Sequence, residues 1–338
     1  MPQRVNGNTS TSPTLLDVAR LAGVSPSTVS RVINEPNLVR QETTEAVRRA
    51  IAQIGYTPNF VAGGLASNRS RLVAVVVPTI ANSIFADTVQ AINDTLTGAG
   101  YQTLVGLTGY DAGQEDELLL AILGRRPDGL ILTGTVHSAT SRKRLIAAAI
   151  PTVQTWDLSA APVDMAVGFS HAEVGRATAR HLHARGHRSI GLVFATDQRA
   201  RVREAALRDE LVRLGCAAPT VAHVPPANAV AFGRSGLRDL MAAGEQLDAV
   251  ACSSDALALG VISEAVAGGL KVPGDLAVMG FGDLDFGGYT SPTLTTVHVD
   301  RAEIGRAAAG MLLSEFAGQR PDDHLRDIGF SILVRESA

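Results

Sequence analysis

The chain has 338 residues, more than one hydrophobic core usually supports, so we expect two or three domains. Apolar residues make up 46% of the chain and aromatic residues only 4%, which favours an aliphatic core of the kind found in layered α/β folds. The net charge is −3, but residues 1–71 carry eight arginines against four acidic residues, a net +4, and the rest carries −7. A basic front on an acidic body favours a polyanion as the partner of the front.

The two cysteines, Cys216 and Cys252, have no CxxC pattern and no histidine at ligand spacing. This argues against a disulfide framework and against a metal site, and we expect no cofactor. Residues 1–13 contain no apolar leader, and the run "LVAVVV" (72–77) is too short to span a bilayer. The sequence therefore predicts a soluble cytoplasmic protein with no membrane partner.

The stretch "TLLDVARLAGVSPSTVSRVIN" (14–34) predicts two short helices joined by a glycine turn. Thr14 and Asp17 form a capping box, so a helix begins near Leu15, with Val18, Leu21 and Ala22 as its buried stripe, and Gly23 ends it. Ser25 caps a second helix that has Pro26 at its first position. A third helix, about 42–54, closes a small core. The outward side chains of the second helix are Ser27, Thr28, Ser30, Arg31 and Asn34.

Two interpretations of this segment stay open on the residues alone. One is a three-helix bundle with an ordinary solvated face. The other is a helix-turn-helix, because short hydroxyls, an amide and one guanidinium can enter a major groove, whereas Glu and Lys dominate an ordinary solvated face.

The pattern D-V-A-x-x-A-G-V-S-x-x-T-V-S-R-V-x-N, followed by "TTEAVRRAIAQIGYTPN", closely resembles the DNA-binding headpiece of the LacI/GalR family of bacterial regulators. The resemblance implies that Pro26, Ser27 and Arg31 read the operator, and that Thr28, Ser30 and Asn34 support binding or contact phosphates. We add Thr14, Ser25, Asn59 and Ala62 to the predicted DNA-binding set. The expected boundaries are a disordered tail (1–13), a DNA-binding domain (14–58), a hinge (59–71) and a core (72–338).

In the hinge, "FVAGGLASNRSR" (60–71), apolar residues recur at four-residue spacing, which is a helical stripe. Such a short helix is marginal alone, and each of its two glycines costs about 1 kcal/mol relative to alanine. It is therefore expected to fold only against a partner, unless it is simply a flexible linker. It resembles the hinge helix of the family, whose leucine wedges into the minor groove; that residue would be Leu65.

From Leu72 onward, apolar runs alternate with amphipathic stretches, which predicts parallel sheets covered by helices on both faces. The pattern breaks near 157–170, so we expect two doubly wound lobes with a ligand between them, at the carboxyl ends of the strands. The chain is expected to cross between lobes near 157–170 and near 282–300. Strands are predicted at 72–77, 102–107, 129–133, 151–156, 189–194, 249–253 and 276–281. Helices are predicted at 85–98, 114–124, 172–185, 199–214, 231–242, 256–268 and 301–317.

No catalytic pattern stands out in the core. "GFGDLDFGG" (280–288) is not a nucleotide-binding GxGxxG, the chain has no Walker loop and no HExxH, and His181 and His183 would face different sides of a helix. The sequence therefore argues against an enzyme.

The core resembles the periplasmic-binding-protein-like effector domain of the same family, in "ARHLHARGHRSIGLV", "SSDALALGVISEA", "GLKVPGDLAVMGFGD" and "SPTLTTV". Within the family, "GYQTLVGLTGYDAGQEDE" and "WDLSAAPVDMAVGFSH" are similar to the gluconate-repressor branch. Where the family often has aspartate or asparagine, this chain has Gly282.

Carrying the ligand residues over by their positions at strand ends gives a predicted effector site. Within it, Arg203, with Arg201 as the alternative, would bind a carboxylate, since guanidinium–carboxylate bonds are charge-assisted. The polar groups of Asp157, Asp283, Ser254 and Thr133 would suit hydroxyls. The whole predicted set is Asn82, Ile84, Phe85, Tyr110, Thr133, His137, Trp156, Asp157, Phe169, His171, Arg201, Arg203, Ser254 and Asp283.

The resemblance thus implies a homodimeric transcriptional regulator, expected to be a repressor, that binds operator DNA and responds allosterically to a sugar acid such as gluconate or a ketogluconate. Three alternatives remain: a sugar receptor without DNA regulation, a regulator that responds to a neutral sugar or a purine, and a sugar-modifying enzyme.

Overall fold

The computed structural model describes residues 13–57, 70–80, 83–134, 138–158, 161–226, 229–244, 246–320 and 323–338. The chain divides into two compact units, Met1–Ser70 and Arg71–Ala338. The predicted hinge lies largely outside the described residues.

The first unit is a bundle of three helices, α1 (Leu15–Ala22), α2 (Pro26–Asn34) and α3 (Gln41–Ile54), with a 3-10 turn η1 (Pro36–Leu38) between α2 and α3. The capping signals act as the sequence predicts: the Thr14 side chain accepts from the Asp17 amide, and the Ser25 side chain accepts from the Thr28 amide. Gly23 ends α1 in the left-handed conformation, with φ 67°.

The core of this bundle is small and aliphatic, and its buried members are Val18, Ala19, Val29, Val32, Val47 and Ala50. One expected core residue is wrong: Leu21 is 45% exposed. Ala19 is buried in its place, because the buried face of α1 is centred on the adjacent pair Val18 and Ala19 rather than on the stripe through Leu21.

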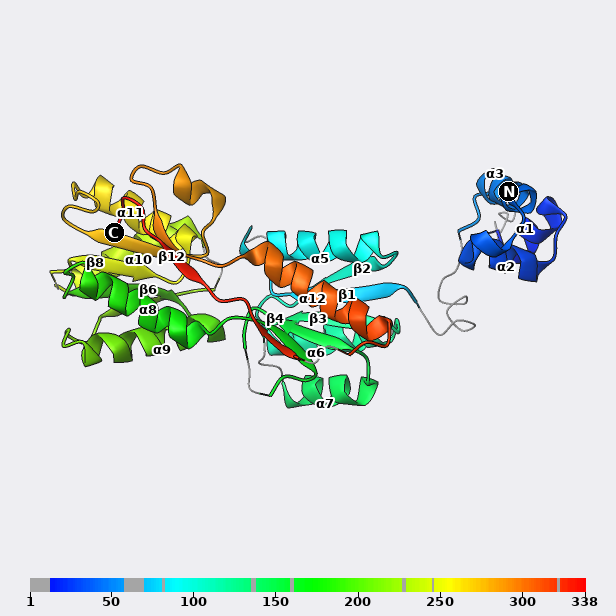
Figure 1. Ribbon diagram of the computed structural model, residues 1–338. Helices are drawn as coiled ribbons and strands as arrows, with labels where there is room; N and C mark the ends of the chain where they lie inside the picture. The colour runs from blue at the N-terminus through cyan, green and yellow to red at the C-terminus, as the bar shows by residue number, and fades with distance from the viewer. Residues whose placement is uncertain are drawn as a thin grey trace, which may run out of the picture. The chain divides into compact units, whose positions relative to one another are not determined.

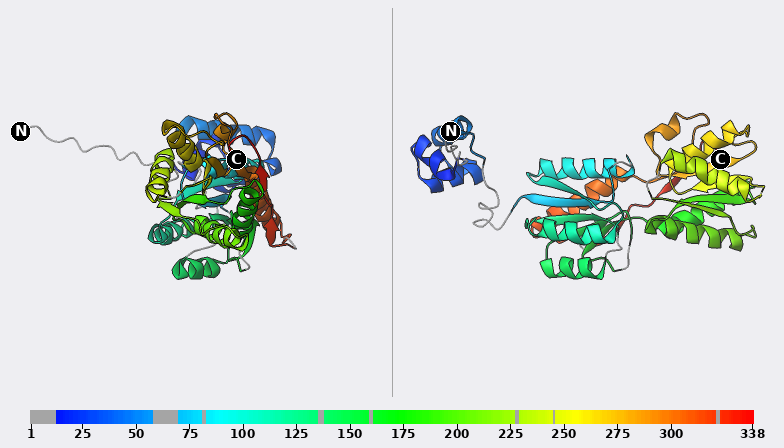
Figure 2. Two further views of the ribbon diagram at one scale, coloured as in Figure 1. Left: turned by 90° about the vertical axis from the view of Figure 1, so that its left-hand side faces the viewer. Right: turned by 180° about the vertical axis from the view of Figure 1, so that it is seen from behind.

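The second unit consists of two lobes, each built on a six-stranded sheet with helices on both faces (Figures 1 and 2). Lobe 1 has the strand order β11-β5-β4-β3-β1-β2, and lobe 2 has β12-β10-β9-β8-β6-β7. All pairings are parallel except that of β10 with β12. The predicted fold class, two parallel α/β lobes preceded by a helical domain, is confirmed.

Lobe 1 comprises β1 (Leu72–Val77), β2 (Gln102–Leu107), β3 (Gly129–Thr133), β4 (Thr152–Thr155), β5 (Met165–Gly168) and β11 (Leu325–Asp327), with η2 (Ser83–Phe85), α5 (Ala86–Gly98), α6 (Ala112–Leu123), α7 (Ala139–Ala148) and α12 (Arg301–Phe316). Lobe 2 comprises β6 (Ile190–Ala195), β7 (Val221–Val224), β8 (Ala249–Cys252), β9 (Ala277–Phe281), β10 (Thr295–His298) and β12 (Ser331–Leu333), with α8 (His171–Ala184), α9 (Gln198–Arg213), α10 (Val230–Ala242), α11 (Asp255–Ala267) and η3 (Asp285–Gly288).

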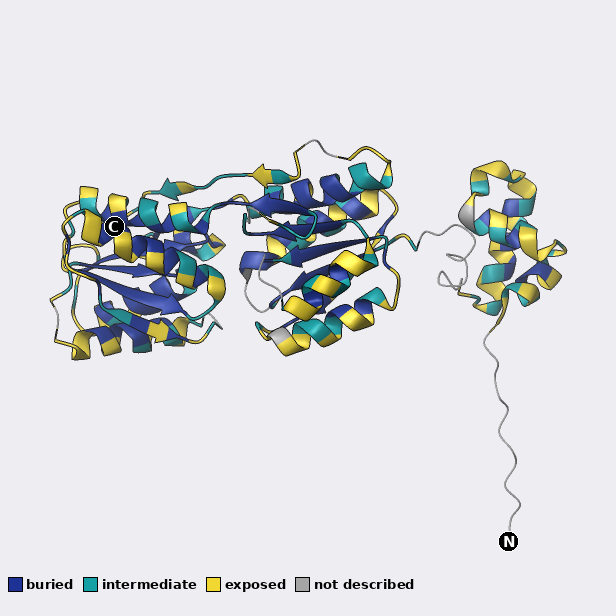
Figure 3. Ribbon diagram, turned by 90° about the horizontal axis from the view of Figure 1, so that it is seen from below, coloured by how far each residue is buried: buried dark blue, intermediate teal, exposed yellow. Residues whose placement is uncertain are grey.

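The central strands, such as β1, β3, β6, β8 and β9, are buried on both faces, as their unbroken apolar sequences require (Figure 3). In β1, Val73, Val75 and Val77 belong to the cluster that includes residues of α5 and α12. Ala74 and Val76 belong to the opposite cluster, with residues of α6 and α7. The side chains of β1 therefore hold the two helical layers of lobe 1 together.

The chain passes between the lobes three times: from β5 to α8, from β10 to α12, and from β11 to β12. Three connections restrict the movement of one lobe on the other and bring the carboxyl ends of β6, β8 and β9 towards those of β1–β4.

Several short elements were not predicted from sequence: β5, β7, β10, β11, β12 and α7. The five strands have only three or four residues each, too few to show a period. In α7, the buried side chains are Ser141 and Leu145, so its apolar pattern is weak.

α10 and α11 approach so closely that glycine is needed where they cross. A Cβ atom at Gly233 would lie 2.0 Å from the carbonyl oxygen of Leu257, and one at Gly260 would lie 2.1 Å from that of Val230. Neither contact is possible without separating the helices.

We therefore expect Gly233→Ala to lower the free energy of unfolding by about 1–3 kcal/mol, measured by urea denaturation. The matched control is Gly310→Ala in α12, where a Cβ would meet no atom within 4 Å. That variant should gain about 0.5–1 kcal/mol from helix propensity. Equal urea midpoints for Gly233→Ala and the wild type would contradict the packing argument.

Candidate functional site

The exposed face of α2 presents small polar groups and one guanidinium. Val29 and Val32 of α2 are buried in the bundle, which leaves the opposite face to solvent. On that face Ser25, Pro26, Ser27 and Arg31 are exposed, and Thr28 and Ser30 are half-buried. No long acidic side chain crowds the described part of this face, so it can approach a polyanion closely.

The hydroxyls at the start of α2 form a cluster. The Oγ atom of Ser25 lies 2.8 Å from both Ser27 Oγ and Thr28 Oγ1. Thr14 plays a capping role in α1, where its Oγ1 donates to Asp17 at 2.6 Å. Of the other predicted DNA-binding residues, Asn59, Ala62 and Leu65 lie outside the described residues, as does the side chain of Asn34.

In the second unit, residues from both lobes line a narrow cavity at the carboxyl ends of the strands. Lobe 1 contributes Ile84, Phe85, Tyr110 and Trp156, and lobe 2 contributes His171, Asp197, Arg199, Arg203, Ser253, Ser254 and Phe281. The volume of the cavity is about 30 Å³, enough for one or two water molecules. The site therefore lies where open α/β sheets bind ligands.

The dominant feature of this cavity is the buried guanidinium of Arg203, on α9. The residue is 6% exposed. Its Nη1 donates to His171 Nδ1 at 3.0 Å, its Nη2 donates to the Ser253 carbonyl at 3.1 Å, and its Cζ lies 4.0 Å from the centre of the Phe281 ring. Burial lowers the pKa of Arg203 to about 10, against the opposing effect of Asp197, so the group stays charged near neutral pH.

His171 is fixed in one neutral tautomer. Burial, followed by the charges of Arg203 and Arg199, lowers the pKa of His171 well below its ordinary value. Because Nδ1 accepts from Arg203, the proton of the neutral ring is on Nε2, which donates to the Trp156 carbonyl at 2.8 Å. This histidine thus connects the guanidinium of lobe 2 to the backbone of lobe 1.

Two lining aromatic residues have an unusual backbone. Tyr110 follows β2 with φ 65°, and Trp156 follows β4 with φ 70°. The left-handed region is costly for bulky side chains, and such residues gather at functional sites. Both rings line the same cavity, although β2 and β4 are separated in the sheet by β1 and β3.

Two buried donors in the cavity lack a partner within the described part of the chain: Arg203 Nε and Trp156 Nε1. Both groups are hydrogen-bond donors. Among the described residues that line the cavity, no buried acceptor lacks a partner. Leaving buried donors unpaired is expensive, so the arrangement suits a ligand rich in oxygen acceptors.

Several predicted effector residues are not among the described lining residues. Phe169 is fully buried and packs against the rings of Trp156 and His171. The exposed Arg201 donates to the Thr196 carbonyl instead, which turns its charge to the start of α9. Asn82 and His137 lie outside the described residues, and Thr133 and Asp157 lie at the ends of β3 and β4 without lining the cavity.

The carboxylate of Asp283, a predicted effector residue, binds two other side chains of the protein. Its Oδ1 accepts from Arg335 at 2.7 Å, and its Oδ2 lies 2.9 Å from His298 Nδ1. These contacts hold the loop after β9 and leave Asp283 outside the described lining.

Sequence reasoning missed four lining residues: Asp197, Arg199, Ser253 and Phe281. Asp197 and Arg199 directly follow β6, so the rule that ligands bind at strand ends pointed to them. Arg199 reaches from lobe 2 to lobe 1, where its Cζ lies 5.3 Å from the centre of the Phe85 ring.

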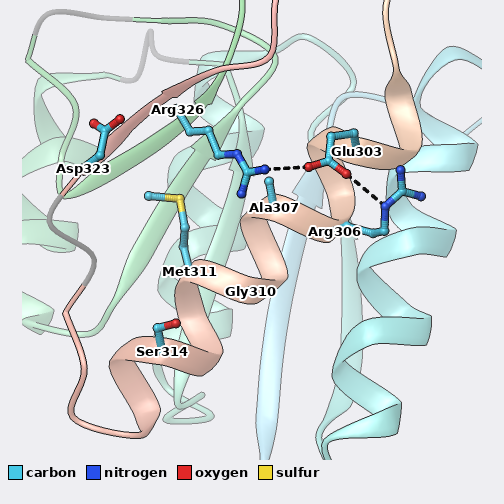
Figure 4. Close-up of a pocket in the computed structure, with 8 residues that line it drawn as sticks. All are labelled: Glu303, Arg306, Ala307, Gly310, Met311, Ser314, Asp323 and Arg326. Atoms are coloured by element: carbon cyan, nitrogen blue, oxygen red, sulfur yellow. Dashed lines mark hydrogen bonds and ion pairs between the residues drawn. The ribbon is translucent and has the colours of Figure 1, made fainter.

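A larger cavity, of about 540 Å³, lies on lobe 1 between α12 and β11 (Figure 4). Its two arginines, Arg306 and Arg326, both bind Glu303, at 3.0 and 2.8 Å. The charges of these two arginines are already paired and are half exposed to water, so they offer little binding energy to a ligand. The smaller interlobe cavity, with its buried and partly unpaired donors, is therefore the better candidate for the ligand site.

Each of the two units matches the model of a known protein family. Residues 14–59 match the model of "Bacterial regulatory proteins, lacI family", and residues 179–338 match a periplasmic binding protein-like domain. The chain is 39% identical over 334 residues to the HTH-type transcriptional regulator GntR of Pseudomonas aeruginosa, covering 98% of this chain and 97% of that protein.

Solved structures of similar fold include further regulators of the same family. A LacI family transcriptional regulator from Silicibacter pomeroyi superposes with a TM-score of 0.90 at 32% identity, covering 96% of this chain and 99% of that one. The lac repressor dimer bound to operator and the anti-inducer ONPF superposes with a TM-score of 0.82 at 27% identity, covering 97% and 99%. Among the described residues, we find no helix with the length and apolarity needed to cross a membrane.

The state of His171 gives a pH prediction. Since its native pKa is lowered, the unfolded chain binds a proton below about pH 6.5 that the native protein does not, so stability falls as the pH drops below that value. His171→Gln, which cannot titrate, should lose less stability between pH 8 and pH 5.5 than the wild type, measured by urea denaturation at both pH values. An equal loss in the two proteins would show that His171 is not held neutral.

Proposed function

The chain belongs to the LacI family of DNA-binding transcriptional regulators, and we propose that a sugar acid bound between its lobes controls its affinity for operator DNA. Its relatives are regulators and not enzymes. The observation that carries the proposal is the buried guanidinium of Arg203, whose Nε donor is unpaired among the described residues, beside the unpaired indole N–H of Trp156.

A carboxylate is the ligand group that best satisfies these donors. It offers two oxygens to a planar guanidinium, and the resulting bonds are about twice as strong as neutral ones. The polar groups of Asp197 and Ser254 can pair with hydroxyls, and the rings of Phe85 and Trp156 give an apolar wall for a carbon chain. An aldonate such as gluconate carries all three features, in keeping with the resemblance to the gluconate-repressor branch and with relatives named GntR.

The narrow cavity implies movement on binding. A six-carbon acid needs several times the room of one or two water molecules, so lining side chains must shift to admit it. Arg199 is the simplest candidate, because it crosses from α9 to the Phe85 ring and would enlarge the cavity by swinging outwards.

We further propose a homodimer, as in the lac repressor dimer, that places two headpieces on a pseudo-palindromic operator. The edge strand β2 supports this, since it exposes Val105 (41%) and Leu107 (47%) beside its unpaired edge. Apolar edge strands are normally covered, and a second copy would cover this one. Effector binding then shifts the paired lobes and changes the spacing of the headpieces.

Arg31 tests the DNA-binding half. Arg31→Ala should weaken operator binding by about 5- to 150-fold, the range of one good base contact, measured by fluorescence anisotropy. The control is Arg20→Ala, also exposed but paired with Asp17 on α1, which should change affinity little. Equal affinities for Arg31→Ala and the wild type would show that α2 does not read the operator.

Arg203 tests the effector half. The single tryptophan, Trp156, lines the cavity, so its emission reports ligand binding, with calorimetry as a check. We expect D-gluconate or a ketogluconate to bind and glucose and ribose not to bind. Arg203→Gln should weaken acid binding at least about 10-fold while operator binding persists, because it removes the charged donor.

The control is Arg201→Gln, two residues away and exposed, which should bind the acid normally. Wild-type protein that binds glucose or ribose, but no acid, would point to the neutral-sugar alternative and overturn the effector class.

A further inference from the structure

Arg301 stands at a junction between the lobes that lies outside the described lining of the ligand cavity. It is the first residue of α12, where the chain returns from β10 of lobe 2 to lobe 1. Its side chain is 11% exposed, and each of its three nitrogens contacts an oxygen atom of another residue. A largely buried guanidinium that binds partners through all of its nitrogens is costly in free energy, which points to a specific role at this chain crossing.

The groups that Arg301 binds belong to different lobes. On lobe 1, Nε donates to Asp87 Oδ2 at 2.8 Å, and Nη2 lies 2.7 Å from the same oxygen. On lobe 2, Nη1 donates to the carbonyls of Gly282 and of Asp283, the latter at 2.8 Å. We call these four residues the interlobe tie.

The lobe 1 end of the tie is rigid. Thr88 Oγ1 donates to the Arg301 carbonyl at 2.9 Å, and a Cβ atom at Gly305 would lie 2.4 Å from the Thr88 carbonyl oxygen. The start of α12 is thus fixed against α5, and the guanidinium projects from that fixed base towards lobe 2.

The lobe 2 end of the tie is the loop that follows β9 beside the ligand cavity. Asp283 has φ 48°, a strained backbone for a residue with a side chain. Its carboxylate binds Arg335 and His298, and the next amide, of Leu284, donates to the buried Asp255 at 2.7 Å. A Cβ atom at Gly282 would lie 3.1 Å from the Cδ1 of Ile84, which lines the cavity from lobe 1.

We propose that Arg301 is a positioning residue that holds the lobes within reach of one ligand through the interlobe tie. The proposal rests on the effector site between the lobes. A ligand bound to Arg203 of lobe 2 and to the rings of lobe 1 needs both at a fixed separation, and the tie supplies part of that separation in advance. Breaking it lowers the populated fraction of the binding-competent arrangement, so the apparent affinity falls by the same factor for every ligand.

This role differs from ligand contact and from simple stabilisation. A contact residue would change the preference between ligands, whereas a tie changes all affinities in proportion. A stabilising pair on the surface would change the urea midpoint and leave the loop after β9 as protected as before.

The test uses full-length protein and the variants Arg301→Gln and Asp87→Asn. Hydrogen–deuterium exchange is followed in the peptide that covers residues 282–290, without ligand. Binding of D-gluconate and of 2-ketogluconate is followed by Trp156 emission. The matched control is Arg306→Gln, on the same helix, whose partners among the described residues are Glu303 and Asp300, both nearby in sequence.

We expect Arg301→Gln to speed exchange in the 282–290 peptide at least about 5-fold and to weaken both ligands at least about 5-fold, by one common factor. Asp87→Asn should act in the same direction but less, and Arg306→Gln should match the wild type. Unchanged exchange, unchanged or tighter binding, or weakening of only one ligand would each overturn the proposal.

If Arg301→Gln fails to fold, Asp87→Asn decides, since the Asp87 side chain is half exposed. A wild type that binds neither acid would refute the effector class, while the exchange experiment would still test the tie.

Discussion

The core of this protein is organised around one costly group, the buried charge of Arg203. A guanidinium away from water must be compensated by well-placed partners. Here the partners are the neutral ring of His171, the Ser253 carbonyl and the face of Phe281. His171 can accept from Arg203 only while its proton is on Nε2, and that proton binds the Trp156 carbonyl of lobe 1. One charge therefore fixes a tautomer and a contact between lobes.

The same chain of contacts offers a route from ligand to DNA. A ligand that pairs with Arg203 and Trp156 acts on both lobes at once, and lobe 1 is the part joined to the headpiece by sequence. Where the chain enters lobe 1, the Arg71 amide donates to Asp128 at 2.9 Å, and the Arg71 carbonyl accepts from Gln102 at 2.8 Å. The end of the linker is thus anchored to β1, β2 and β3. Any movement of lobe 1 shifts the point from which the hinge emerges, which is the physical requirement for coupling.

Sequence reasoning succeeded where local chemistry decides. The capping of α1 and α2 by Thr14 and Ser25 and the long apolar strands all carry their signal in a few neighbouring residues. It could not show what distant partners decide: Leu21 lies outside the bundle core, and the carboxylate of Asp283 binds Arg335, 52 positions later in the chain. The short strands β5, β7, β10, β11 and β12 were not predicted either, because their pairing partners rather than their composition make them strands.

Gly282 shows why membership in the family does not by itself define the ligand. The resemblance to the family implies aspartate or asparagine at this position in many of its members. Here φ is 122°, a conformation that favours glycine, and a Cβ atom would already press on Ile84. A side chain at 282 therefore cannot contribute hydroxyl recognition in this arrangement. Polar groups that line the cavity from the same lobe are Asp197 and Arg199, which follow β6, and Ser254, which follows β8. These three polar groups all belong to lobe 2, whereas lobe 1 contributes the indole N–H of Trp156, the ring of Tyr110 and the apolar side chains of Ile84 and Phe85.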